Sequence, residues 1–159
     1  MENTKLNKIT YGVLGVLAAL MLGWIILTAM TGNEWATMQE GQAETYVLRV
    51  ADNPVEKLRG LAGTEPVDLG DAIGMVFVYN DATERTFTMK GMNYALDFVW
   101  VRDGKIVRID KNVAAPVDGE DPKQVSSSPL NVDMVIEMPA GTVDSLYYLV
   151  GHQLTITLQ

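Results

Sequence analysis

The chain has 159 residues, no cysteine, a single histidine and a formal net charge of −8 at pH 7. Without cysteine it forms no disulfide, thiolate nucleophile, iron–sulfur cluster or cysteine-bound zinc site. Its negative charge repels phosphate backbones and favours solubility, so we expect no nucleic-acid partner.

The amino-terminal region contains an uncharged, strongly apolar segment that runs from Ile9 to Asn33. A helix rises ~1.5 Å per residue, so its apolar part of about 20 residues covers ~30 Å, the thickness of the hydrocarbon core of a bilayer. The sequence therefore predicts a transmembrane helix over residues 9–32, preceded by a cytoplasmic stub of residues 1–8.

The charged residues on either side of this segment predict its orientation. Lys5 and Lys8 precede it, whereas Glu34, Glu40 and Glu44 are the first charged residues that follow. Because basic residues stay on the cytoplasmic side, we expect a single-pass protein of the cytoplasmic membrane with its amino terminus inside. The rest of the chain then lies outside, in the periplasm or on the cell surface.

A cleavable signal peptide is the alternative interpretation of the same segment. Signal peptides have a shorter apolar core, of ~7–15 residues, which ends at a small-x-small cleavage site. The run in this chain is longer, and the tetrapeptide from Thr28 to Thr31 is a poor site. We therefore favour an uncleaved anchor.

The residues after the anchor predict a short linker and then one domain. Residues 33–44 are mostly polar, with few apolar positions, which is typical of a tether between membrane and domain. From Thr45 onward Tyr46, Leu48 and Val50 alternate with other residues, the period of a β-strand. The exported domain is expected to comprise residues 45–159.

A short helix is expected next, because Asn53-Pro54-Val55-Glu56 combines a capping residue, a proline suited to the first helical position and a glutamate three residues after the cap. We expect Val55, Leu58 and Leu61 to point inward. Gly60 is suited to the end of this helix, because glycine adopts a left-handed conformation without strain.

Further strands are expected wherever apolar residues run or alternate. Asp103-Gly104 separates two such segments and is a strong hairpin signal. Residues 133–138 alternate between apolar and polar and are expected to be half exposed, and Thr142 is expected to cap a short helix that ends at Leu149. The other expected strands cover residues 74–79, 86–90, 96–102, 105–110 and 154–158, with a turn at 80–85.

Many short strands and only two brief helices predict an all-β domain, either a sandwich or a barrel. One densely apolar segment of it, from Phe87 to Trp100, reads FTMKGMNYALDFVW. Four further blocks lie before and after this segment, at residues 58–61, 74–79, 103–107 and 136–141.

Together these five blocks resemble the domain of unknown function 192 family, over about residues 46–156. The resemblance implies a compact, mostly β domain similar to a jelly-roll sandwich, often exported or membrane-tethered in bacteria and archaea. It implies no established reaction.

The central segment keeps part of the family pattern, which reads Phe-Trp-Met-Lys-Asn-Thr and then Pro-Leu-Asp. The residues that agree with the pattern are Phe87, Met89, Lys90, Leu96 and Asp97. Four residues of this segment depart from the pattern: Thr88 replaces its tryptophan, Gly91 its asparagine, Met92 its threonine and Ala95 its proline. Earlier in the chain, after Gly60-Leu61, Ala62 replaces a methionine of the family. These departures remove one large aromatic ring and two polar groups.

Three charged residues in these blocks are the candidate ligand-binding site. In the functional interpretation Lys90 holds an anionic group, Asp97 orients the ligand or accepts a proton, and Arg59 adds a second cation. In the structural interpretation the three side chains neutralise one another while their stems cover apolar core.

The other polar groups are expected to have no role in catalysis. Asp118 to Asp121 lacks the alternating ligand spacing of a calcium loop, which favours a solvated turn. His152 follows a glycine before the last strand, so we expect a structural or solvent-exposed role. We predict no metal site and no cofactor.

Two hypotheses for the function follow. The preferred one is a non-enzymatic module at the cell envelope, anchored by its single span, that binds an unknown envelope protein or a small ligand. The alternative is an envelope-associated hydrolase that uses Asp97 and Lys90.

Overall fold

The computed structural model describes residues 33–159. The predicted stub, residues 1–8, and the predicted transmembrane helix, residues 9–32, lie outside the described residues, so both stay predictions. Within the described part of the chain, no helix has the length and hydrophobicity that a membrane span requires.

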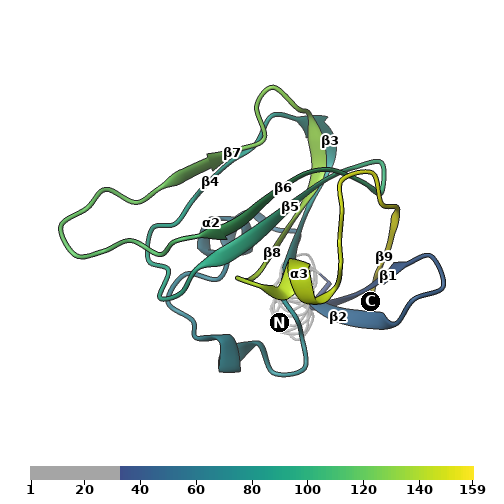
Figure 1. The fold of residues 1–159 in the computed structure, drawn as a ribbon, viewed down its shortest axis with the longest axis horizontal. Coiled ribbons are helices and arrows are strands. Elements are labelled where there is room, and N and C mark those ends of the chain that lie inside the picture. Colours follow the sequence, from purple (N-terminus) through teal and green to yellow (C-terminus); the bar gives the residue numbers. More distant parts are fainter. Residues whose placement is uncertain (1–32) are drawn as a thin grey trace, which may run out of the picture. The chain divides into compact units, whose positions relative to one another are not determined.

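Seven strands form one curled sheet in the order β6-β5-β8-β3-β2-β1-β9 (Figure 1). Neighbouring strands run antiparallel except β2 and β3, which are parallel and are connected through a helix and a 3-10 turn. A separate two-stranded sheet pairs β4 with β7. The elements are β1 (Trp35–Glu40), β2 (Thr45–Ala51), α2 (Pro54–Arg59), η1 (Pro66–Leu69), β3 (Met75–Thr83), β4 (Thr86–Thr88), β5 (Leu96–Arg102), β6 (Lys105–Val113), β7 (Gln124–Ser126), β8 (Val132–Pro139), α3 (Thr142–Ser145) and β9 (Leu154–Leu158).

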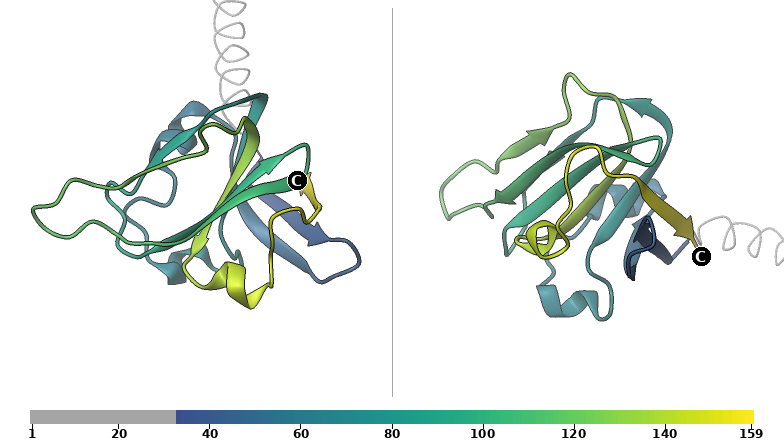
Figure 2. Two further views of the ribbon diagram at one scale, coloured as in Figure 1. Left: turned by 45° about the horizontal axis from the view of Figure 1, so that its top comes forward. Right: turned by 45° about the vertical axis from the view of Figure 1, so that its right-hand side comes forward.

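The two edge strands of the large sheet meet at one end, so the sheet curls into a half-barrel (Figure 2). The backbone N–H of Ile106 donates to the carbonyl of His152 over 2.9 Å, and that of Leu154 donates to Gly104 over 2.7 Å. Gly104 has φ +73°, and a Cβ on it would lie 2.9 Å from the backbone oxygen of Leu154, so only glycine fits there. The predicted hairpin at this glycine is confirmed, and the same turn joins the edges of the sheet.

The expected mostly β fold with two short helices is confirmed. The finer similarity to a jelly roll does not extend to the topology. A jelly roll is built from antiparallel strands in two facing sheets, whereas here a parallel pair lies near the middle of one curled sheet.

The inner face of the half-barrel is a continuous hydrophobic core. Every strand of the large sheet supplies buried apolar side chains, and α3 adds Val143. Burial of each large side chain stabilises the fold by ~1.5–3 kcal/mol, so a chain without disulfides holds its shape through this core. Its members are Ala36, Met38, Leu48, Val50, Val76, Val99, Val101, Ile106, Ile136, Met138, Val143, Tyr148 and Leu154.

A second core covers the outer face of three adjacent strands, β5, β8 and β3. Phe87 of the small sheet packs edge-on against rings of the large sheet, with centroid distances of 4.9 Å to Phe77, 5.9 Å to Phe98 and 5.7 Å to Trp100. The Trp100 indole N–H donates to Asp110 over 2.7 Å, so this buried ring leaves no polar atom without a partner. Phe87 therefore holds the small sheet on the outer face.

The prediction of a linker over residues 33–44 was wrong. Strand β1 lies inside this range, between β2 and β9, and its Ala36 and Met38 side chains are fully buried. The polar composition concealed a period-two pattern of small and apolar side chains. The folded domain therefore begins before Thr45, with Asn33 already donating two hydrogen bonds to Asp52.

Helix α2 begins as predicted but exposes different residues. The Asn53 side chain caps it by accepting from the backbone N–H groups of residues 55 and 56, each over 3.1 Å. The expectation that Val55 and Leu58 point inward was wrong, because these side chains are 70% and 91% exposed. The helix ends at Gly60, so the buried Leu61 follows it and does not belong to one of its faces.

Strand β8 was expected to be half exposed, and this was also wrong. It pairs with β3 on one side and β5 on the other, so both of its faces are covered by hydrophobic cores. Its outer-face residues are therefore buried, including Glu137, which is 5% exposed.

Two element ends also differ from the predictions. The helix expected to run from Thr142 to Leu149 is the single turn α3, and Gly141 is its cap. Strand β3 continues to Thr83, into the turn expected at residues 80–85.

Candidate ligand pocket

The structure brings together two of the three predicted site residues. Arg59 and Lys90 line the same pocket on the outer face of the large sheet. Asp97 is not among the residues that line it. Strand alternation places Asp97 on the inner face with Val99, opposite to Phe98, so it does not meet Lys90.

Asp97 is a structural residue in this fold. Its carboxylate is 1% exposed and accepts three backbone hydrogen bonds, from Asn112 (2.8 Å), Gly141 (2.9 Å) and Val143 (3.1 Å). These bonds tie the end of β6 and the first turn of α3 to β5. Both carboxylate oxygens are therefore occupied, and the residue holds three segments in place.

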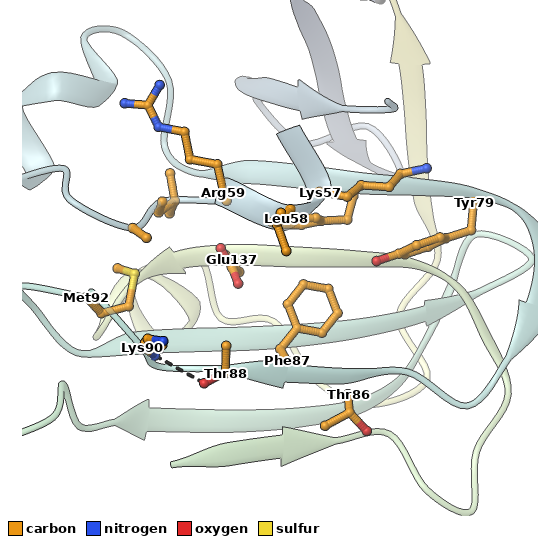
Figure 3. A pocket seen from close by; sticks show the side chains of 14 residues that line it. Lys57, Leu58, Arg59, Tyr79, Thr86, Phe87, Thr88, Lys90, Met92 and Glu137 are labelled. Atoms are coloured by element: carbon orange, nitrogen blue, oxygen red, sulfur yellow. Dashed lines mark hydrogen bonds between the residues drawn. The ribbon is translucent and has the colours of Figure 1, made fainter. Parts of the chain in front are cut away.

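The pocket lies between helix α2 and the β4 segment and has a volume of about 190 Å³ (Figure 3). Its wall is partly apolar and partly basic, and a single acidic residue lies at its inner side. The lining residues are Lys57, Leu58, Arg59, Gly60, Leu61, Ala62, Phe77, Tyr79, Thr86, Phe87, Thr88, Lys90, Met92 and Glu137.

Glu137 is the residue of this pocket that the sequence analysis missed. In Figure 3 its carboxyl extends from β8 into the space between α2 and Phe87. The Oε2 atom is buried and has no hydrogen-bond partner among the described residues. Burial raises the pKa of Glu137 from its usual 4.5 to about 8, and a hydrogen bond from the Leu61 backbone opposes this rise only in part. At neutral pH the group is therefore a carboxylic acid.

The close approach of the α2 end to Glu137 depends on Gly60. This residue has φ +52°, and a Cβ on it would lie 3.1 Å from Phe77 Cζ and 3.3 Å from Glu137 Oε2. Any larger side chain would be strained by the backbone and would crowd the carboxyl. Gly60 thus keeps the pocket open next to the acid.

One side of the pocket is formed by a stack of charged and aromatic groups. The Lys57 ammonium lies 4.6 Å from the centroid of the Tyr79 ring, and the Arg85 guanidinium lies 3.8 Å from it. Burial lowers the pKa of Lys57, and burial raises the pKa of Tyr79. These cation–π contacts fix Lys57 at the side of the pocket.

Three of the five departures from the family pattern line this pocket. Ala62, Thr88 and Met92 are among its lining residues, and a Cβ on Gly91 would contact Ala62 at 3.4 Å. Thr88 is exposed at the mouth, where the family pattern has a tryptophan. The small side chains at positions 62 and 88 leave space that larger ones would fill.

The remaining polar candidates show no ligand site. Residues 118–121 form an exposed turn, and within residues 33–159 no group of three or more potential metal ligands lies together. His152 Nδ1 lies 2.5 Å from Glu40 Oε1, which links the segment before β9 to β1. This contact is consistent with the structural role expected for the histidine.

Substitution of Asp97 and substitution of Lys90 should change the free energy of unfolding by very different amounts. We expect Asp97→Ala to lower the free energy of unfolding by about 3 kcal/mol or more, because three backbone N–H groups, one of them buried, lose a charged acceptor. Lys90→Ala should change it by less than about 0.5 kcal/mol, because the side chain is exposed. Urea unfolding of residues 33–159, which contain both cores, measures the difference, and equal effects would contradict these roles.

Glu137 should make stability depend on pH. Below about pH 4.5 the Glu137 carboxyl is protonated in both the folded and the unfolded protein. Between about pH 4.5 and 8 it is protonated only in the folded protein. Stability of the native protein should therefore fall as pH rises through this window, by as much as about 5 kcal/mol, and Glu137→Gln should abolish that fall. Urea unfolding at pH 5, 7 and 9 measures it, with the exposed Glu84→Gln as the control. A constant difference between native protein and Glu137→Gln across this range would refute the buried neutral acid.

Two solved structures are similar to this chain. One is from Sinorhizobium meliloti 1021 and is described as a candidate transcription regulator, with 26% identity, a TM-score of 0.60, and coverage of 78% of this chain and 93% of that one. The other, a protein of unknown function from Novosphingobium aromaticivorans DSM 12444, has 26% identity and a TM-score of 0.59, and covers 76% of this chain and 83% of that one. A comparison with curated proteins found no match.

The family resemblance noted in the sequence is confirmed. The sequence model of DUF192, described as "Uncharacterized ACR, COG1430", matches residues 36–156, which span nearly the whole sheet from β1 to β9. With this match over most of its length, the chain belongs to the DUF192 family.

Proposed function

We propose that the domain is a binding module for a small organic ligand, held on the outer side of the cytoplasmic membrane by its amino-terminal helix. The observation that carries the proposal is the Glu137 carboxyl. A buried polar atom without a partner costs stability, so each such atom calls for an explanation, which a ligand or an ordered water in the adjoining pocket would supply. Glu137 lines the pocket, so a ligand bound there would lie beside this carboxyl.

The surroundings of Glu137 support a ligand site. Small-molecule sites are concave and mostly apolar, with a few polar groups that orient the ligand. Here Phe87 and Met92 give apolar wall, and the acid lies between them and α2 (Figure 3). An acid with a strongly raised pKa in a pocket is a recognised sign of a functional site.

A hydrolase that uses Asp97 and Lys90 is less well supported by this geometry. Asp97 lies on the other face of the sheet with both oxygens hydrogen bonded. Hydrolysis of glycosides uses two carboxyl groups flanking one bond, whereas Glu137 is the one acidic residue lining the pocket. Binding therefore fits the arrangement better than this chemistry.

The name of the Sinorhizobium protein raises transcription regulation as another possibility for this family. Residues 33–159 contain 19 acidic and 10 basic residues, a formal charge of −9. Direct binding to a phosphate backbone requires a basic surface, so we expect no nucleic-acid partner for this domain.

Ligand binding can be tested through the methionine methyl groups of the full-length protein in detergent micelles, labelled with ¹³C. We expect members of a library of small acids, amides, amines and sugars to shift the Met92 methyl signal, because Met92 lines the pocket. The Met38 signal, from the inner core, should stay unchanged.

The control variant is Thr88→Trp, which places a large ring at the mouth of the pocket. It should abolish the shifts of Met92, whereas Thr155→Trp on the exposed face of β9 should leave them intact. Absence of any Met92 shift across the library, or shifts that persist in Thr88→Trp, would rule out this pocket as the binding site.

The position outside the membrane can be tested by cysteine labelling, because the chain has no native cysteine. We expect Asp118→Cys, in an exposed turn, to react with a membrane-impermeant maleimide on intact spheroplasts, and Asn3→Cys to react only after lysis. The opposite pattern would place the domain in the cytoplasm.

A further inference from the structure

The protonation state of Glu137 restricts what its ligand must offer. Burial favours the protonated form of the Glu137 carboxyl, and a protonated carboxyl in the pocket wall can donate a hydrogen bond as well as accept one. The natural partner of such a group is an acceptor oxygen on the ligand. A ligand that offers only donors leaves this requirement unmet.

The charged side chains around the pocket restrict the ligand further. Besides Glu137, the charged residues that line it are Lys57, Arg59 and Lys90, all basic. Within residues 33–159 neither Arg59 nor Lys90 forms a salt bridge, although acidic residues outnumber basic ones by 19 to 10 there. This local excess of positive charge in an acidic domain favours an anion.

The positions of the basic groups indicate which of them can touch a ligand. In Figure 3 Lys90 lies below Glu137 next to Thr88, whereas the Arg59 side chain extends away from the carboxyl. Lys57 is held against Tyr79. Lys90 is therefore the expected direct partner of the anion, and Arg59 acts through its field or after turning toward the mouth.

The pocket also offers apolar surface beside these groups. Leu58 is 91% exposed at the rim, and Phe87 and Met92 form part of the wall. An exposed leucine at the mouth of a pocket is readily covered by an apolar ligand group. A purely inorganic anion would leave this apolar surface exposed to water.

Resting on the proposed function, we propose that the pocket binds a small organic carboxylate. One oxygen of the ligand carboxylate accepts the hydrogen bond from Glu137, and Lys90 balances the charge. The apolar body of the ligand lies against Phe87 and Leu58. A neutral acid that donates to a carboxylate forms a charge-assisted hydrogen bond, which is stronger than one between neutral groups.

The proposal can be tested with three probes of one shape and different charge: 4-fluorobenzoate, 4-fluorobenzamide and 4-fluorobenzylamine. Their binding to the full-length protein in micelles is measured at pH 6.5 by ligand-observed ¹⁹F NMR, with protein-free micelles as the blank. We expect 4-fluorobenzoate to bind at least tenfold more tightly than the amide and the amine not to bind.

Two variants locate the interaction. Lys90→Ala should weaken 4-fluorobenzoate binding at least fivefold, because it removes the cation beside the carboxylate. Lys105→Ala, an exposed lysine on β6 that does not line the pocket, removes the same charge from the domain and should have no effect. Equal weakening by both variants would mean that only net charge matters and would overturn the proposal.

The pH dependence of binding gives a third, independent readout. The titratable and charged groups near Glu137 are Lys57 and Arg59 on α2, Tyr79 on β3, and Lys90 and Tyr94 after β4. We expect the affinity for 4-fluorobenzoate to fall at least tenfold from pH 6.5 to pH 9, as Glu137 ionises and repels the ligand. Glu137→Gln still donates a hydrogen bond, so its affinity should vary less than threefold over the same range.

The outcomes separate this inference from the proposed function. If the amine or the amide binds as well as the benzoate, and Thr88→Trp blocks it, the pocket is a ligand site but its ligand is not a carboxylate. If 4-fluorobenzoate fails to bind, or binds with the same pH dependence in Glu137→Gln, the carboxylate proposal is wrong. The methionine library experiment then decides separately whether the pocket binds any ligand.

Discussion

The structure depends on the burial, on both faces, of three adjacent strands of its large sheet. Strands β3, β5 and β8 carry apolar side chains on each side, so the sheet needs two covers. The sheet supplies the inner one by curling until β6 meets the segment before β9. The outer one is assembled from smaller parts, namely the β4–β7 pair, which Phe87 holds in place, and the segment around α2.

An assembled cover leaves a gap where its parts meet, and the candidate site is such a gap. Helix α2 contributes no buried residue, so it borders the pocket without filling it. Small residues at positions 62 and 88 widen the space between α2 and β4. Glu137 reaches into the space from the central strand and is buried enough to remain an acid. Its chemistry thus follows from its position in the sheet.

Much of this fold could be predicted from the sequence, but the position of each strand in the sheet could not. Alternation and turn residues correctly indicated β2, β5 and the hairpin at Gly104. Strand β1 was missed because its buried residues, Ala36 and Met38, stand among polar ones. Glu137 was missed because period two alone cannot distinguish an edge strand from a central one. Arg59 and Lys90, which were chosen for their charge, line one pocket, whereas Asp97 satisfies backbone groups that no pattern reveals.

The three hydrogen bonds that backbone N–H groups donate to Asp97 have a consequence for evolutionary studies of the family. A residue that joins three segments of the fold in this way is needed whatever the protein binds. Its presence in a relative therefore carries little information about the ligand of that relative. Divergence in specificity should instead be sought at positions 62, 88 and 92, where a substitution alters the cavity and leaves the scaffold intact. Under the proposed function, sorting homologues by these three sites is the comparison expected to group them by ligand.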